Sequence, residues 1–232
     1  GWKLLRRNRP FMRLLLAYIM NGIANGLPAS LFVLFVAHVL RAESWTGPLL
    51  LTYFIVGIAA LPGWLWLSRR LGKHRAWAVS MLWTSLVFIW VPFLGPGDTW
   101  AFLLICVLSG VGVAVDMALP AAIQADLVDL DTAAGGGRRT GLYFGIWNMA
   151  TKLALALAVG IAFPLLEGFG FDATAIDNRD GTLALAMFYG AVPVAFKLLA
   201  TALMWHFPVD RRMQTATRAR VHAVEGKPEP LG

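Results

Sequence analysis

The residue whose type and position most suggest chemistry is Lys152, a single cation inside a long apolar run. It follows Arg139 by 13 residues, which corresponds to roughly 20 Å along a helix at 1.5 Å per residue. Asn148 lies one helical turn earlier and can share its face. If this run crosses a membrane, a charge at such depth is costly and commonly functional. We therefore predict that Lys152 and Asn148 contribute to a solute or ion pathway, with a purely structural ion pair as the alternative.

Two further charges, Asp116 and Lys197, lie inside other apolar runs. Three interpretations of Asp116 remain open: a structural partner for a lysine, a proton or substrate site, or a position near the cytoplasmic interface. For Lys197 we favour a structural role, in which it pairs with Asp116 or is hydrated locally. The sequence leaves open whether Asp116 pairs with Lys152 or with Lys197.

The first apolar run contains two amides, Asn21 and Asn25, one helical turn apart. Gly22 and Gly26 form a small-xxx-small face that permits close approach of another helix, and Pro28 is expected to kink the chain. The segment is either a packing seam with a kink or a bent helix whose amides face an aqueous cavity. On the second interpretation Asn21 and Asn25 join Lys152, Asn148 and Asp116 in the pathway.

A polar hinge separates two of the apolar runs. It begins with three carboxylates between residues 125 and 131, continues through a glycine-rich turn, and ends with two arginines that open the next run. Opposite charges that face each other at a membrane surface can form pairs that break when a gate opens. We predict such a cytoplasmic gate from Asp126, Asp129, Arg138 and Arg139.

The composition excludes most soluble classes. The chain has 232 residues, of which 58% are hydrophobic and only 14% charged, whereas a soluble domain carries about a quarter charged residues. Long apolar runs between short basic loops indicate a polytopic membrane protein. The net charge of +7 lies mainly in those loops, so we expect contact with the lipid bilayer and no nucleic acid.

No motif for catalysis or for a resident metal is present. The sequence has no phosphate-binding loop, nucleophile elbow or zinc-protease motif, and its four histidines are dispersed. The single cysteine, Cys106, excludes a disulfide framework within the chain. We expect no enzyme, no catalytic residues, no metal site and no cofactor of the chain's own.

The sequence contains six apolar segments, each close to or longer than the roughly 20 residues that span a bilayer. They predict an all-α protein with six transmembrane helices. We expect a cytoplasmic segment over 1–11 and a cytoplasmic, disordered tail over 208–232, on either side of a bundle over 12–207. The expected helices are 12–40, 47–67, 76–94, 100–123, 140–166 and 183–207.

Lysine and arginine set the expected orientation. Sixteen lie in segments on one side of the predicted membrane, and only Arg41 and Arg179 lie on the other. By the positive-inside rule both termini are cytoplasmic. We expect an integral protein of a bacterial inner membrane.

Several of these residues carry a resemblance to a known family. The stretches 125–131 and 138–145 and the pair Thr151–Lys152 resemble the glycoside–pentoside–hexuronide:cation symporter family. This is the melibiose-carrier-like branch of the major facilitator superfamily. The opening stretch 8–11 and the region from 168–171 to Pro193 are similar as well, so the likeness covers nearly the whole chain but only the second half of a family member.

The resemblance implies a function and a partner. The six helices would be the C-terminal six-helix bundle of a twelve-helix transporter, and Lys152 would be the cavity-facing lysine of its eleventh helix. The protein would be a secondary active transporter that couples a cation or proton to symport of a sugar or related small solute. The coupling Na⁺ or H⁺ would be bound mainly by an N-terminal half. The alternative is a self-contained six-helix protein that acts as a homodimer or is a non-transporting remnant.

Overall fold

A computed structural model describes residues 8–133, 140–172 and 179–207 of the chain, and these form helices joined by short connections. The long helices are α2 (Arg9–Leu34), α3 (Thr46–Leu71), α4 (Lys73–Phe88), α5 (Thr99–Ala133), α6 (Thr140–Gly168), α7 (Arg179–Tyr189) and α8 (Ala191–Trp205). Three short helical turns, η1 (Phe35–Val39), η2 (Glu43–Trp45) and η3 (Val91–Phe93), extend or join them. The predicted all-α class is confirmed.

Six of the helical stretches are long and apolar enough to cross a membrane. Within the described residues they are Arg9–Val39, Glu43–Leu71, Lys73–Phe93, Thr99–Thr132, Thr140–Gly168 and Asp180–Trp205. Each overlaps one of the six expected ranges. The last span is divided between α7 and α8, because α7 ends at Tyr189 and α8 begins at Ala191. Most of the expected N-terminal segment and the whole tail after residue 207 lie outside the described residues.

Local sequence explains where the first spans begin and end. The side chain of Asn8 caps α2 by accepting a hydrogen bond from the Phe11 amide at 3.2 Å, and Pro10 lies in the first turn, where its missing N–H costs nothing. Helix α3 ends at Leu71 and is followed by Gly72, whose φ of 90° is a conformation that favours glycine. The basic residues Arg69 and Arg70 lie in the last turn of α3, where they complement the helix dipole.

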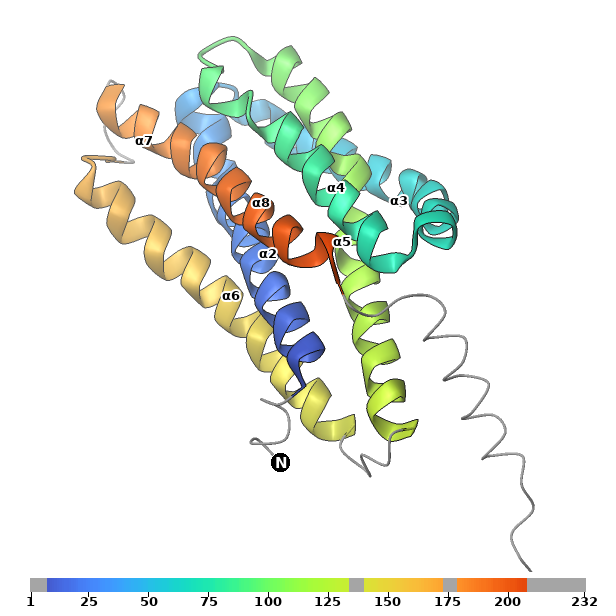
Figure 1. Ribbon diagram of the computed structural model, residues 1–232. Coiled ribbons are helices and arrows are strands. Elements are labelled where there is room, and N and C mark those ends of the chain that lie inside the picture. The colour runs from blue at the N-terminus through green and yellow to red at the C-terminus, as the bar shows by residue number, and fades with distance from the viewer. Residues whose placement is uncertain (1–7, 134–139, 173–178, 208–232) are drawn as a thin grey trace, which may run out of the picture.

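The bundle has two poorly covered edges. Helix α2 packs against α6 on one side and α8 on the other, while α4 packs against α5 and α8, and α3 packs against α5. Figure 1 shows α6 and α3 on opposite sides of the molecule. Only 17% of the apolar window of α3 and 28% of that of α6 are buried, against 44–50% in the other spans. Much of α3 and α6 therefore faces lipid, water or further protein.

The predicted small-residue seam on α2 is confirmed. A Cβ atom added to Gly22 would lie 2.8 Å from the Cβ of Ala154, and one added to Gly26 would lie 2.8 Å from that of Ala158. Both alanines are buried on α6. Close backbone approach between helices is the usual means of helix association in lipid, where no hydrophobic driving force exists between apolar faces.

The core consists of two hydrophobic clusters, one at the first half of α2 and one at its second half. One contains Phe11, Leu14 and Ala17 near the beginning of α2, and the other contains Ile23 and Leu27 in its second half. Between Ala17 and Ile23 lies the buried amide of Asn21. The boundary between the clusters is thus where polar groups enter the interior.

Candidate functional site

A buried ion pair joins α5 and α8. The Lys197 ammonium lies 2.8 Å from Oδ2 of Asp116. The side chains of these two residues are only 3% and 7% exposed. The attraction between the two charges offsets part of the cost of removing both from water, and the pair carries no net charge. Of the open alternatives, the structure thus pairs Asp116 with Lys197 and not with Lys152.

Three uncharged side chains complete the coordination of the pair. Lys197 donates a second hydrogen bond to Oδ1 of Asn21 at 2.9 Å, and the Asn25 amide donates to Oδ2 of Asp116 at 3.2 Å. The indole Nε1 of Trp77 donates to Oδ1 of Asp116 at 3.0 Å. Both carboxylate oxygens are therefore occupied, as a buried charge requires.

This polar network, which consists of Asn21, Asn25, Trp77, Asp116 and Lys197, ties together α2, α4, α5 and α8. Hydrogen bonds to charged groups are about twice as strong as those between neutral groups, and a low-dielectric interior strengthens them further. Removing either charge of the pair would leave the other without its counter-charge. The packing of all four helices therefore depends on both members of the pair.

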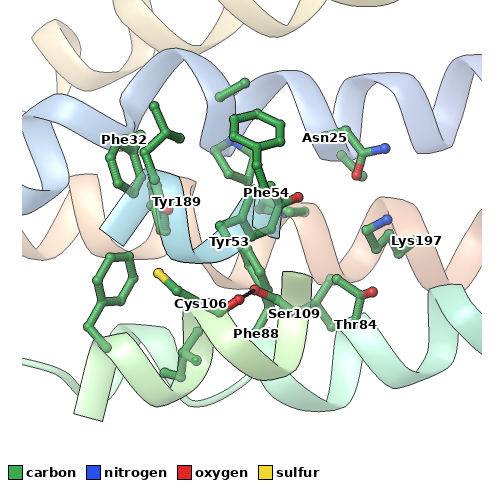
Figure 2. Close-up of a pocket in the computed structure, with 18 of the residues that line it drawn as sticks. Asn25, Phe32, Tyr53, Phe54, Thr84, Phe88, Cys106, Ser109, Tyr189 and Lys197 are labelled. Atoms are coloured by element: carbon green, nitrogen blue, oxygen red, sulfur yellow. Dashed lines mark hydrogen bonds between the residues drawn. The ribbon is translucent and has the colours of Figure 1, made fainter. Parts of the chain in front are cut away.

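A cavity of about 350 Å³ lies beside the polar network. Its walls come from α2, α3, α4, α5, α7 and α8, and its lining includes Asn25 and Lys197. Figure 2 shows Asn25 and Lys197 at one end of the cavity and the aromatic side chains Phe32 and Tyr189 toward the other. A mainly apolar cavity with a few convergent polar groups is the usual form of a small-molecule site.

Lys152 and Asn148 lie elsewhere, on the exposed side of α6. Lys152 makes no hydrogen bond or ion pair with any residue that the structure describes. The adjacent Thr151 hydroxyl is 2.9 Å from the Tyr18 hydroxyl, and Tyr18 stacks on Trp147 at 3.9 Å between ring centroids. The structure thus brings Asp116, Asn21 and Asn25 together and does not bring Lys152 and Asn148 to them. Their role in a pathway stays a prediction.

The hinge acids have different environments. Asp126 is buried and forms an ion pair of 2.6 Å with Lys73, the first residue of α4. Lys73 also donates to the carbonyl of Ala122 at 3.3 Å. Asp129 is exposed. Arg138 and Arg139 lie outside the described residues, so the predicted gate pairs stay a prediction.

Sequence reasoning did not find three residues of this region. Trp77 is fully buried and supplies a donor to Asp116. Tyr53 and Tyr189 line the cavity. A signal for Trp77 existed, because a tryptophan inside an apolar helix needs an acceptor for its N–H. It did not point to one acceptor, since the indoles of Trp64 and Trp83 use the α5 carbonyls of Val111 and Leu108 instead.

No group of three or more metal-ligating side chains occurs in the parts of the chain that the structure describes. The charges of the network are satisfied by one another and by amide and indole groups. The side chains gathered at this site offer ion pairing and hydrogen bonding.

Comparison of the sequence with known proteins identifies its family. A family model described as MFS/sugar transport protein matches residues 1–211. The chain belongs to this family. The membership confirms the predicted resemblance to melibiose-carrier-like members of the major facilitator superfamily, and it makes the chain a transporter-family membrane protein.

Individual relatives of this MFS/sugar transport chain are distant. It is 22% identical to a sodium-dependent lysophosphatidylcholine symporter 1-A of Danio rerio, with 90% of the chain and 40% of the relative covered. It is 27% identical to an uncharacterized symporter of Synechocystis, over 93% of the chain and 41% of the relative. It is 24% identical to a glucuronide carrier protein homolog of Escherichia coli, over 88% and 45%. The chain spans less than half the length of these relatives.

Removing one partner of the buried ion pair should destabilise this MFS/sugar transport chain far more than removing both. Lys197→Met leaves the Asp116 carboxylate unpaired and Asp116→Asn leaves the ammonium unpaired, and each should cost about 3–5 kcal/mol. The double variant should recover most of that loss, because no isolated charge remains and the amide introduced by Asp116→Asn still offers an acceptor to Trp77. Thermal unfolding in detergent measures all three.

The control for this cycle is Lys152→Met, which removes the same kind of side chain from an exposed position and should change the stability little. Additive losses in the double variant would contradict the pairing of Asp116 with Lys197.

Proposed function

We propose that the chain is part of a secondary active transporter that couples a cation or proton to symport of a sugar or related small solute. The observation that carries the proposal is the buried Asp116–Lys197 pair beside a solute-sized cavity in a chain of the MFS/sugar transport protein family. Ionisable residues inside a membrane commonly mark substrate and ion pathways. Transporter sites commonly lie near the bilayer midplane.

The polar network supports a role in coupling because it holds two opposite charges against each other beside the cavity. Weakening the contact between Asp116 and Lys197 would free the ammonium for a solute group or for Asn21 alone. Asn25, which contacts Asp116 and lines the cavity, would transmit a change on either side to the other. The main site for the coupling Na⁺ or H⁺ lies, on this proposal, in an N-terminal half.

The exposed side of α6 supports a partner half. Lys152 lies about 18 Å from the beginning of α6 at 1.5 Å per residue, which is near mid-membrane. A lysine facing lipid at that depth would cost several kcal/mol, so this side must meet water or protein. An N-terminal six-helix half, packed so that the two halves enclose a cavity, would provide both. The six helices would then rock against that half as one body.

The names of the relatives differ in their solute. One is a glucuronide carrier protein homolog, and another is a lysophosphatidylcholine symporter. A sugar or glycoside-like solute is the choice that agrees with the family description.

The location follows from the same reasoning. Six apolar spans and the family membership make this an integral membrane protein. We propose a bacterial inner membrane with both termini on the cytoplasmic side, because the basic residues gather in loops and tails of one side.

Lys152→Ala should abolish accumulation of the solute while leaving the amount of protein in the membrane unchanged. The reason is that Lys152, an exposed cation with no ion-pair partner among the described residues, contributes to the pathway and little to folding. Uptake of a radiolabelled glycoside into cells or proteoliposomes measures it. Arg69→Ala, at an exposed cation on the last turn of α3, is the matched control, and normal accumulation by Lys152→Ala would disprove the assignment of Lys152.

The double variant Asp116→Asn with Lys197→Met tests coupling separately from stability. If the network couples cation movement to transport, this variant should fold, bind solute and exchange it across the membrane, but fail to accumulate it against a gradient. Counterflow and active uptake in the same proteoliposomes distinguish the two activities. Active accumulation at the wild-type level would show that the pair is only a structural tie.

The alternative function is a six-helix protein that acts as a homodimer or does not transport. The mass of the native polypeptide in its source membrane decides between the two. We expect a species about twice the 25.3 kDa of this chain, as a twelve-helix carrier requires. A species near 25.3 kDa would contradict the partner half and favour the homodimer or remnant.

A further inference from the structure

The Lys197 ammonium occupies a small site whose polar walls are oxygen atoms. It donates hydrogen bonds of 2.8 Å to Oδ2 of Asp116 and of 2.9 Å to Oδ1 of Asn21. An ammonium group has three donors, and these two bonds leave one of them for the cavity, which Lys197 also lines. Carboxylate and amide oxygens are the ligands that hard cations prefer. The oxygens around Lys197 therefore have the chemistry of a cation site, with a lysine side chain as its occupant.

Groups other than Lys197 hold these oxygen atoms in place. The indole of Trp77 donates to Oδ1 of Asp116 at 3.0 Å, and the Asn25 amide donates to Oδ2 at 3.2 Å. Asn21 is buried on α2, with 2% of its surface exposed. Because these contacts do not involve the lysine, the ligand oxygens stay arranged for a cation when the ammonium moves away.

The charge of the site fits one monovalent cation. Asp116 is the only carboxylate of the polar network, and no group of three or more His, Cys, Asp or Glu residues occurs within the described ranges. One carboxylate balances one positive charge, whereas a divalent ion would leave an uncompensated charge in an apolar interior. The ligand class is therefore a small monovalent cation, such as Na⁺ or a primary ammonium.

The cavity gives such a cation a route to the site. Figure 2 shows the side chains of Asn25 and Lys197 at the same end of the cavity. Val33, Leu50 and Phe54 line its wall and are 60%, 41% and 48% exposed, so the cavity opens there. Its volume of about 350 Å³ admits a hydrated ion, since a water takes about 30 Å³. The displaced ammonium can turn into the same space.

We propose that Asp116, Asn21 and Asn25 form a monovalent-cation site within these six helices, for which an external cation competes with the Lys197 ammonium. The Asn25 amide carries a carbonyl oxygen besides its donor and supplies a third ligand by turning over. The site is additional to the main coupling site that the proposed function assigns to an N-terminal half. Exchange of the two cations keeps the carboxylate neutralised and releases the ammonium into the cavity. Only contact of that ammonium with a solute rests on the proposed function.

The exchange can be measured in the native polypeptide in detergent. Acetic anhydride reacts with lysine amines that are not held in an ion pair, and mass spectrometry of the α8 peptide gives the acetylated fraction of Lys197. This fraction should be several-fold higher in sodium chloride than in choline chloride of equal ionic strength, because choline is bulky and has no N–H donor. Lys152, which is exposed, is the internal control and should be labelled equally in both salts. Equal labelling of Lys197 would overturn the proposal.

Chemical rescue of a deletion variant tests the oxygen site directly. Lys197→Ala removes side-chain atoms equivalent to n-propylammonium, so this amine should fill the vacated space and restore the charge. A hundredfold excess over its dissociation constant should raise the midpoint of thermal unfolding by about 5 °C or more, because the amine binds only the folded state. 1-Propanol, which has the shape without the charge, and tetramethylammonium, which has the charge without a donor, should not.

Two variants control the rescue. Lys152→Ala makes the same deletion at an exposed position, and Asp116→Asn with Lys197→Ala removes the carboxylate as well; neither should respond to n-propylammonium. No rise for Lys197→Ala, or an equal rise for Lys152→Ala, would overturn the site. Recovery of folded Lys197→Ala only when n-propylammonium is present during purification would support it. If the variant is not recovered at all, the labelling of Lys197 decides.

These outcomes separate the cation site from the proposed function. Sodium-dependent labelling of Lys197 together with rescue of Lys197→Ala would support the site even in a protein that takes up no glycoside, and that failure would contradict only the proposed function. Active, cation-driven uptake by a protein that shows neither response would leave the transporter intact and overturn the site.

Discussion

The structure depends on the cost of placing a full charge in an apolar interior. Asp116 and Lys197 offset that cost by pairing, with oxygen and nitrogen 2.8 Å apart. Two amides and an indole form further hydrogen bonds with the pair. An isolated ion in such a place would shift its protonation or unfold the bundle. Because the partners come from α2, α4, α5 and α8, the packing of those helices and the neutrality of the pair are mutually dependent.

The cost of a charge in an apolar environment also applies to the poorly covered edge of the bundle at α6. Where α2 meets α6, small residues bring the helices close and leave little room between them. Beyond that seam, α6 exposes Asn148 and Lys152 at membrane depth. A bundle that neutralises one of its membrane charges internally leaves another at an edge, where a charge at membrane depth is costly unless water or protein lies beside it. That contrast is one reason for the proposal of a partner half.

The cavity lies beside the neutral ion pair of Asp116 and Lys197 and not beside Lys152. Its polar end shares Asn25 and Lys197 with the network, so a group bound at that end would lie directly against the ion pair. Solute binding and charge movement would then act on the same side chains. Coupling between two ligands requires that both bias a common element, and Asn25 is positioned to be part of one.

The sequence by itself determined the membrane class, the six helical spans and the family, because these depend on local properties: apolar run length, basic loops and a hinge motif. It also determined which residues carry charge within the spans. It could not determine their partners. Lys152 and Lys197 are chemically the same, and one-dimensional spacing places both near mid-helix. Only the packing of α8 against α2 and α4, with α4 against α5, directs Lys197 inward to Asp116 and leaves Lys152 exposed. Tyr53, Trp77 and Tyr189 join the site for the same reason: a cavity exists only where distant helices meet.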